Sequence, residues 1–289
     1  MAAPDAAAAV APAAAAVRAL TPVERTCVQV ALYRLLAGER SGAAAAGYAG
    51  AEHDARLVGA LLPPAERAAM IADSAQRLES VVSMMLVRTA ELDARLSAEA
   101  AAAPGAAARQ VVLIGAGMDT RAWRLAWRPD ARLFEVDSPG VLELKAAAMA
   151  GGPPPRCARV PVAADACAPA EMLAALRAAG LDASRPVLWL LEGFLGYLTV
   201  PAMEGLLSAL HGASAPGSAL VATAPPTPGQ RARYDASGAK MHHSTFEEVG
   251  ETRARLERAG WAVERVVDSA ELEARYGAAQ FVNILHCRN

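Results

Sequence analysis

An apolar stretch that breaks into a glycine-rich turn constrains the fold of this chain more than any other feature. Residues 111–120 read VVLIGAGMDT, in which four apolar residues precede Gly115 and Gly117. Glycines let the backbone turn tightly and let a ligand approach it without meeting a Cβ atom. The stretch therefore predicts a buried strand that delivers its backbone to a ligand.

The chain after this strand alternates short apolar stretches with helical patterns, which is typical of an open, mostly parallel α/β sheet. Further strands are predicted at residues 132–137, 159–163, 186–191, 218–223, 261–267 and 280–286. Pro161 places the 159–163 strand at an edge, because proline donates no ladder hydrogen bond. No long helix separates the last two strands, so we expect them to close the sheet as an antiparallel pair.

The region before the sheet has a helical pattern, and the clearest helix is predicted over residues 76–96. Arg88 lies at the edge of its apolar stripe, where a guanidinium needs an anionic partner or a route to solvent. We expect three regions, which are a disordered alanine-rich tail (1–20), an N-terminal helical cap (21–105) and the ligand-binding core (106–289).

Composition argues against several kinds of partner and site. The formal net charge of −2 over 289 residues gives no basic excess for binding nucleic acid. The four cysteines form no Cys-x-x-Cys pair, so we expect free thiols in a reducing compartment and no metal site. No apolar run reaches the about 18 residues that a membrane span needs. We expect a cytoplasmic protein; the alternative is an organelle, with the alanine-rich start as its targeting segment.

Two further segments carry expectations. Residues 225–241 are predicted to form a long loop, in which Arg231, Arg233 and Lys240 would face an anionic ligand if the loop is not simply solvated. Residues 244–247 read STFE, a capping box that predicts the start of the next helix.

The residues around the glycine turn favour one ligand. Asp137 ends the second strand, where a carboxylate can accept hydrogen bonds from both ribose hydroxyls. A dinucleotide site needs a small residue where Thr120 stands, and Asp119 before it would repel a pyrophosphate. S-adenosylmethionine has no phosphate and a positive sulfonium, so this methyl donor is favoured over NAD(P). An NAD(P)-dependent reductase stays as the alternative from another class.

Several stretches closely resemble the leucine carboxyl methyltransferase family and its bacterial-type relatives. They are GAGMDTRAWRL (115–125), FEVDSP (134–139), VRTAELDARL (87–96), AAD (163–165), WLLEGFLGYLT (189–199) and GWAVERVVDSAELEARYG (260–277). The resemblance implies a class I methyltransferase fold. This fold is a Rossmann-like, seven-stranded, mostly parallel sheet with an antiparallel C-terminal strand and an N-terminal helical cap.

The resemblance also implies which residues bind S-adenosylmethionine. Gly115 and Gly117 match the turn beside the methionine part, and Asp137 matches the acid that binds the ribose. Asp165 and Ala166 match the pair at the adenine, although the family usually has leucine where Ala166 stands.

Three more positions match residues of the cofactor and acceptor sites. Arg88 matches an arginine that holds the cofactor's carboxylate, and Glu192 matches an acid that faces its amino group or methyl centre. Tyr197 matches a tyrosine that holds the substrate carboxylate in the protein-methylating members. Glu192 and Tyr197 are therefore the candidate catalytic residues. Asp119 and Arg124 are expected to form a structural pair that supports the turn.

The acceptor is predicted to be a carboxylate of a small molecule, because an ionised carboxylate needs no general base. A hydroxyl would need one, for which Tyr197 and the neighbouring His242 and His243 are the candidates, although adjacent histidines in a loop are more often surface residues. Protein-methylating members recognise a C-terminal leucine, and the glycine-rich residues 41–51 replace their basic motif. A protein C-terminus stays as the alternative acceptor. A non-catalytic binding protein is disfavoured, because the matching cofactor residues are present.

Overall fold

The computed structural model describes residues 6–39, 48, 50–101, 110–236, 242–277 and 282–289. The chain forms two compact units that do not follow the predicted boundary at residue 105. The first unit combines residues 1–95 with 117–125 and 139–156, and the second combines 96–116, 126–138 and 157–289. Two segments that follow strands of the sheet therefore belong to the helical unit.

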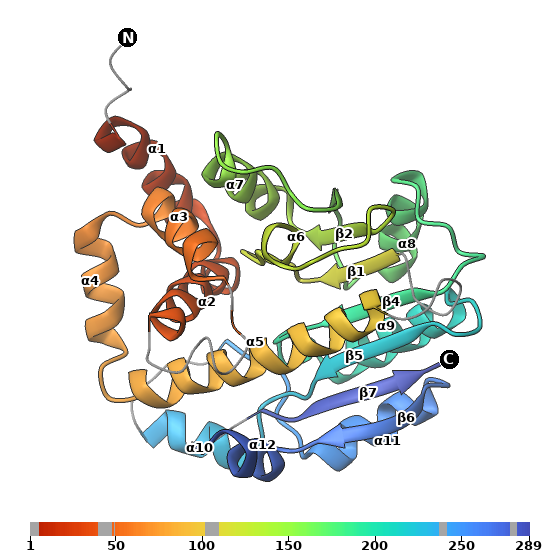
Figure 1. Ribbon diagram of the computed structural model, residues 1–289. Helices are drawn as coiled ribbons and strands as arrows, with labels where there is room; N and C mark the ends of the chain where they lie inside the picture. Colours follow the sequence, from red (N-terminus) through yellow and green to blue (C-terminus); the bar gives the residue numbers. More distant parts are fainter. Residues whose placement is uncertain (1–5, 40–47, 49, 102–109, 237–241, 278–281) are drawn as a thin grey trace. The chain divides into compact units, whose positions relative to one another are not determined.

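The second unit is built on a seven-stranded sheet (Figure 1). Its strands are β1 (Gln110–Ile114), β2 (Arg132–Asp137), β3 (Ala158–Ala163), β4 (Val187–Leu191), β5 (Ala219–Thr223), β6 (Ala262–Val267) and β7 (Ile284–Arg288). The order is β3-β2-β1-β4-β5-β7-β6, and only β7 runs antiparallel to its neighbours. The predicted fold class is confirmed, and so is the edge position of the strand that carries Pro161.

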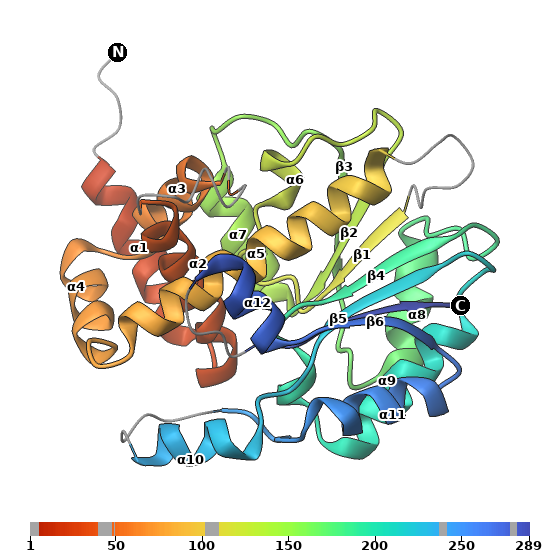
Figure 2. The ribbon, with the colours of Figure 1, turned by 60° about the horizontal axis from the view of Figure 1, so that its bottom comes forward.

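Three helices of the second unit, α8 (Pro169–Ala178), α9 (Val200–Gly212) and α11 (Val249–Arg258), lie along one face of the sheet (Figures 1 and 2). Alternate residues of the strands point toward them, because successive side chains of a strand face opposite ways. Their shared core includes Val112, Phe134, Trp189 and Leu220 from the strands, and Leu176, Leu207 and Leu256 from the helices.

The predicted loop over residues 225–241 is wrong, since α10 (Pro228–Ala236) forms inside it. Thr227 and Gln230 cap this helix reciprocally: the amide of Gln230 donates to Thr227 Oγ1 at 3.3 Å, and the amide of Thr227 donates to Gln230 Oε1 at 2.6 Å. Lys240 and the side chain of Arg233 lie outside the described residues.

The predicted start of the next helix at residues 244–247 is also wrong. Helix α11 begins at Val249, and its capping box uses Glu248, whose amide donates to Glu251 Oε2 at 2.9 Å. The amides of Ser244 and Thr245 instead donate to the carbonyl of Gly196. The short helix α12 (Ser269–Tyr276) connects β6 to β7.

The first unit is helical. It contains α1 (Ala6–Ala19), α2 (Pro22–Gly38), α3 (Ala51–Leu61), α4 (Pro64–Asp73), most of α5 (Leu78–Ala101), α6 (Arg121–Arg124) and α7 (Pro139–Met149). Helix α1 replaces most of the predicted disordered tail and buries Ala14 and Val17. The predicted apolar stripe of α5 is confirmed, because Val82, Met85 and Leu92 are buried.

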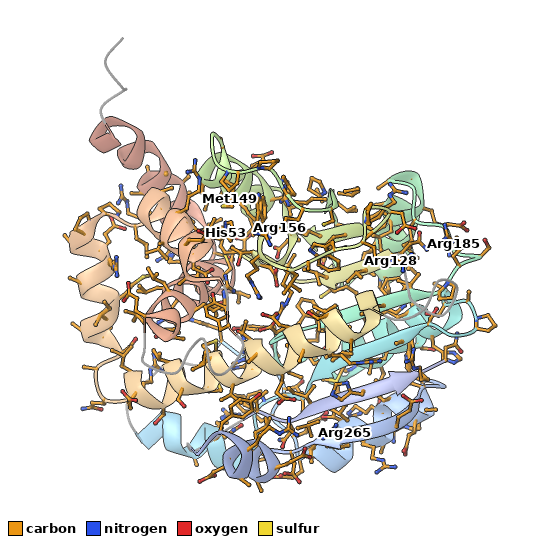
Figure 3. All side chains as sticks on the ribbon, viewed as in Figure 1. His53, Arg128, Met149, Arg156, Arg185 and Arg265 are labelled. Atoms are coloured by element: carbon orange, nitrogen blue, oxygen red, sulfur yellow. The ribbon has the colours of Figure 1, made fainter. Side chains whose placement is uncertain are left out.

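Helix α3 packs against α7 in this unit. His53 of α3 interacts electrostatically with Arg156, and Figure 3 labels both residues. Burial lowers the pKa of His53, and Arg156 adds to this although Glu52 opposes it. The histidine is therefore held in its neutral form at neutral pH.

A network of buried charges fixes residues 117–125 within the first unit. Asp93 Oδ1 of α5 accepts hydrogen bonds from Arg121 Nε at 2.8 Å and from Arg124 Nη2 at 2.9 Å. Arg121 also pairs with Asp119, whose Oδ1 accepts from the Arg121 amide at 2.6 Å. Burial alone would raise the pKa of Asp119, but Arg121 and Arg124 hold it well below its usual range. Arg124 hydrogen bonds to Asp93 and its charge also lowers the pKa of Asp119, so the expected Asp119–Arg124 pair is one part of a larger network.

A second buried pair reaches the same segment. Arg34 of α2 donates to Asp54 Oδ1 of α3 at 2.9 Å and also hydrogen bonds to the carbonyl oxygen of Met118. Tyr48 donates to the other oxygen of Asp54. Arg34 and Asp54 are 7% and 0% exposed, so neither charge is left to water. Helix α5 therefore holds the segment after Gly117 through buried ion pairs, and α2 holds it through the hydrogen bond from Arg34 to Met118.

Asp93→Ala should destabilise the protein strongly, because it leaves two buried guanidinium groups without the carboxylate that they share. We expect the free energy of unfolding to fall by about 3–5 kcal/mol in urea denaturation followed by circular dichroism. Asp130→Ala is the control, since Asp130 pairs with Arg128, a residue that Figure 3 labels, at the surface, and its loss should cost less than about 1 kcal/mol. Equal losses in the two variants would contradict the structural role of Asp93.

Candidate functional site

Four of the predicted site residues of the second unit lie at the carboxyl ends of neighbouring parallel strands. Gly115 follows β1, Asp137 ends β2, Asp165 follows β3 and Glu192 follows β4. These strands are adjacent in the order β3-β2-β1-β4, so the four positions share one edge of the sheet. Ligands of open α/β sheets bind at this edge, where the strand order reverses.

The backbone conformation at position 115 and the nearby ring of Phe194 both require a glycine there. Its φ is +70°, a left-handed value that favours glycine, and a Cβ atom there would lie 2.5 Å from the ring of Phe194. The amides of Gly115 and Ala116 both donate to the carbonyl of Val136 at 3.0 Å. The turn is thereby fixed beside the end of β2, where Asp137 lies. Phe194 is not among the predicted site residues, although it lies within the matched stretch 189–199.

The two acids after β2 and β3 are oriented by backbone amides. Asp137 is half-buried, and its Oδ1 accepts from the amide of Ser138 at 2.8 Å. Asp165 is exposed, and its Oδ1 accepts from the amide of Cys167 at 2.8 Å. The amide of Ala164 donates to the carbonyl of Asp137 at 3.2 Å, which ties the two segments together. Ala166 is buried in the core of the unit, so of the predicted adenine-binding pair only Asp165 has an exposed side chain.

The segment after β4 carries the two candidate catalytic residues. Glu192 is half-buried at the end of the strand, and the next amide, that of Gly193, donates to Thr223 Oγ1 at 2.7 Å. Tyr197 ends the short 3-10 helix η1 (Leu195–Tyr197), and its ring centroid lies 4.5 Å from that of His243. From the sequence, a histidine in a loop beside a second histidine is expected to be a surface residue. The structure instead places the ring of His243 against Tyr197, a predicted site residue. His242 is exposed, as that interpretation expects.

The remaining predicted site residues, Arg88 and Gly117, belong to the first unit. Arg88 is 9% exposed on α5, so it is buried rather than extended into solvent. Gly117 has a φ of +45°, and a Cβ atom there would lie 2.9 Å from the Cβ of Cys27. The absence of a side chain at Gly117 therefore allows close packing against α2, and the place of this glycine beside the cofactor stays a prediction.

Two observations bear on classes of site and location. Among the described residues, no group of three or more histidine, cysteine or acidic side chains is placed to hold a metal ion. Every helix in the described parts of the chain is too short or too polar to cross a membrane.

The chain is similar to a known family. The model of the leucine carboxyl methyltransferase family matches residues 11–211. A candidate S-adenosyl-L-methionine-dependent methyltransferase of Mycobacterium avium is 37% identical over 191 residues, which are 61% of this chain and 62% of that protein. A protein of the same name from Mycobacterium marinum is 35% identical over 238 residues, which are 75% of this chain and 74% of that protein. The chain thus spans about three fifths of the length of the first relative.

Two solved structures share the fold. A DUF574 family protein of Streptomyces avermitilis gives a TM-score of 0.60 at 22% identity, over 82% of this chain and 95% of that chain. A candidate methyltransferase of Thermobifida fusca gives a TM-score of 0.58 at 22% identity, over 82% of this chain and 92% of that chain. At this identity the likeness concerns the fold alone.

Gly115→Ala should destabilise the protein, because an alanine at this φ is strained and its Cβ atom would collide with Phe194. We expect the free energy of unfolding to fall by at least about 1–2 kcal/mol in thermal or urea denaturation. Gly205→Ala in α9 is the matched control, since a Cβ atom there meets nothing within 4 Å and alanine favours a helix. If Gly115→Ala is as stable as this control, the turn does not require glycine.

Proposed function

The chain belongs to the leucine carboxyl methyltransferase family, and on that premise we propose that it transfers a methyl group from S-adenosylmethionine to a carboxylate of a small molecule. The observation that carries the proposal is the row of Gly115, Asp137, Asp165 and Glu192 along the carboxyl edge of the sheet. The names of the mycobacterial relatives support the choice of methyl donor. The cytoplasm stays the expected location.

The residues at this edge fit S-adenosylmethionine in their chemistry. The Asp137 carboxylate, oriented by the Ser138 amide, suits ribose hydroxyls, which donate hydrogen bonds. Glu192 suits the positively charged amino group or sulfonium, and Asp165 would face the adenine. Arg88 would bind the cofactor's carboxylate, because its guanidinium forms paired hydrogen bonds with carboxylates.

A pyrophosphate-containing cofactor fits less well. Thr120 stands where a dinucleotide site needs glycine or alanine, so that helix and strand can pack closely over the pyrophosphate. The charge of Asp119 beside it is already paired with Arg121 and carries no weight in this comparison. This argument supports a sulfonium cofactor over NAD(P).

The protein's contribution to methyl transfer would be positioning and exclusion of water. S-adenosylmethionine supplies an activated methyl group on a positively charged sulfur. The acceptor oxygen must lie within about 3–3.5 Å of the methyl carbon and in line with the sulfur. The hydroxyl of Tyr197 would donate a hydrogen bond to the acceptor carboxylate and so orient it. No proton needs to be removed, because the carboxylate is ionised at neutral pH.

A small molecule is the acceptor that the sequence favours. The stretch over residues 41–51 contains neither lysine nor arginine, unlike the basic motif expected for recognition of a C-terminal leucine. Most of it lies outside the described residues, so this argument rests on the sequence. Methylation of a protein C-terminus is the alternative within the same chemistry.

Asp137→Ala should weaken binding of S-adenosylmethionine by about 1–3 kcal/mol, because charge-assisted hydrogen bonds to the ribose are lost. Isothermal titration calorimetry measures this directly. Asp182→Ala is the matched control, because Asp182 is exposed and its backbone pairs with Gln110 at the amino ends of the strands. Unchanged affinity in Asp137→Ala, or binding of NADH instead of S-adenosylmethionine, would refute the assignment.

The chemistry of the acceptor can be read from the product. We expect the purified protein to transfer label from methyl-labelled S-adenosylmethionine to the small-molecule fraction of a bacterial extract. Mild alkali should then release the label as volatile methanol, because methyl esters hydrolyse and methyl ethers do not. Label that stays in the product after alkali would show a hydroxyl acceptor, and label on protein would show the alternative substrate class.

A further inference from the structure

Beside Tyr197, the second unit contains a cluster of rings that the family resemblance does not assign. The ring of His243 lies 4.5 Å from that of Tyr197, at an interplanar angle of 35°, and 6.0 Å from that of Phe246. The guanidinium carbon of Arg231, on α10, lies 4.9 Å from the centre of the Phe246 ring. Two segments that follow different strands therefore meet at Tyr197.

Backbone hydrogen bonds hold His243 in this place. The amides of Ser244 and Thr245 donate to the carbonyl of Gly196 at 2.8 and 3.0 Å, and Thr245 Oγ1 donates to the carbonyl of Leu198 at 2.6 Å. A Cβ atom on Gly196 would lie 2.6 Å from His243 Cδ2. The imidazole thus occupies space that only a glycine at position 196 leaves open.

The two nitrogens of the imidazole differ. His243 Nδ1 is buried and has no hydrogen-bond partner among the described residues. A buried N–H without a partner is rarer than an unpaired acceptor, which favours the tautomer with its proton on Nε2. Burial, followed by the charge of His242, lowers the pKa of His243 to about 4, so the ring is neutral at physiological pH. Its Nε2–H is then a neutral donor on a half-buried ring beside Tyr197.

We propose that His243 is an acceptor-binding residue, whose Nε2–H donates a hydrogen bond to the acceptor carboxylate next to Tyr197. The proposal rests on the proposed function and adds the second group that orients the acceptor. A neutral donor holds a carboxylate without cancelling its negative charge and places no second cation beside the sulfonium. Arg231, at the far end of the ring cluster, supplies the positive charge that favours an acidic acceptor.

The step balances without proton transfer. The acceptor oxygen forms a bond to the methyl carbon, the carbon–sulfur bond breaks, and its electron pair stays on sulfur. The products are a methyl ester and S-adenosylhomocysteine. His243 keeps its proton on Nε2 throughout.

The lowered pKa of His243 argues against a role as general base for a hydroxyl. A phenol has a pKa near 10, so transfer of its proton to this imidazole would be uphill by about six pKa units, a factor of about a million in the equilibrium constant. The groups that face the ring among the described residues are His242 on its own segment, Tyr197 on η1 and Arg231 across Phe246. None of them is an acid that would restore a pKa near neutrality.

The test compares His243→Phe with His243→Gln. Phenylalanine keeps a flat ring against Tyr197 but removes the donor, whereas glutamine keeps a donor. The probe is the methanol-releasing transfer of label from S-adenosylmethionine to the extract fraction that the wild type methylates. We expect His243→Phe to lower kcat/KM for that fraction about 10- to 100-fold, while calorimetric affinity for S-adenosylmethionine changes less than twofold. His243→Gln should recover part of the loss.

His211→Phe is the matched control, because His211 also contacts a ring, that of Trp261, but lies at the end of α9. It should leave transfer unchanged. A second readout is nitrogen-15 NMR of histidine-labelled protein, which should show His243 neutral and protonated on Nε2 from pH 5.5 to 8.

Several results would overturn the proposal. One is that His243→Phe retains more than half of the wild-type kcat/KM for methyl transfer. Another is that His243→Phe loses affinity for S-adenosylmethionine in parallel with transfer. The third is that NMR shows the His243 ring of the wild type charged, or protonated on Nδ1, at pH 7. If the wild type binds the cofactor but forms no ester, the proposed function fails and this inference falls with it. If the wild type forms the ester and His243→Phe does so equally well, only this inference fails.

Discussion

The buried ion pairs around Asp93 and Arg34 are the interaction on which the rest of the structure depends. Arginine and aspartate side chains are costly to bury, and each of these is acceptable only because its partners are also buried and well oriented. The network takes its acids from α3, α5 and the segment 117–125, and its bases from α2 and the same segment. The glycine turn therefore begins in the sheet unit at Gly115 and continues in the helical unit at Gly117. The conformation of a predicted cofactor turn thus depends on helices that come earlier in the chain.

The strands could be predicted from sequence because their signals are local. Apolar stretches bounded by Gly, Pro and Asp located β1, β2, β4 and β5 to within a residue or two, and Pro161 identified an edge. Signals that depend on distant residues failed. The sequence at 244–247 fits a capping box, but the amide of Ser244 donates to the carbonyl of Gly196 and the amide of Glu247 donates to the carbonyl of Pro226. Helix α10 is not predicted, because the proline and glycine at its start are typical of loops, although Thr227 and Gln230 form a capping box.

The site shows the same division. The order of the parallel strands was enough to place Gly115, Asp137, Asp165 and Glu192 at one edge. Sequence could not show that the open side of Gly117 is filled by Cys27, since that contact joins residues far apart in the chain. The sequence also favours a surface position for His243, because neighbouring histidines in a loop are usually solvated. What distinguishes this histidine from His242 is burial against Gly196 and Tyr197, which the sequence around it does not encode.

The missing side chain at Gly196 has a consequence for comparing relatives. A protein with alanine or a larger residue at the corresponding position could not keep an imidazole packed there without moving the whole 242–245 segment. The two positions should therefore vary together across homologues, with glycine retained wherever the histidine is. Such a paired signature would separate relatives that share this acceptor chemistry from those that have kept the sheet and changed the substrate.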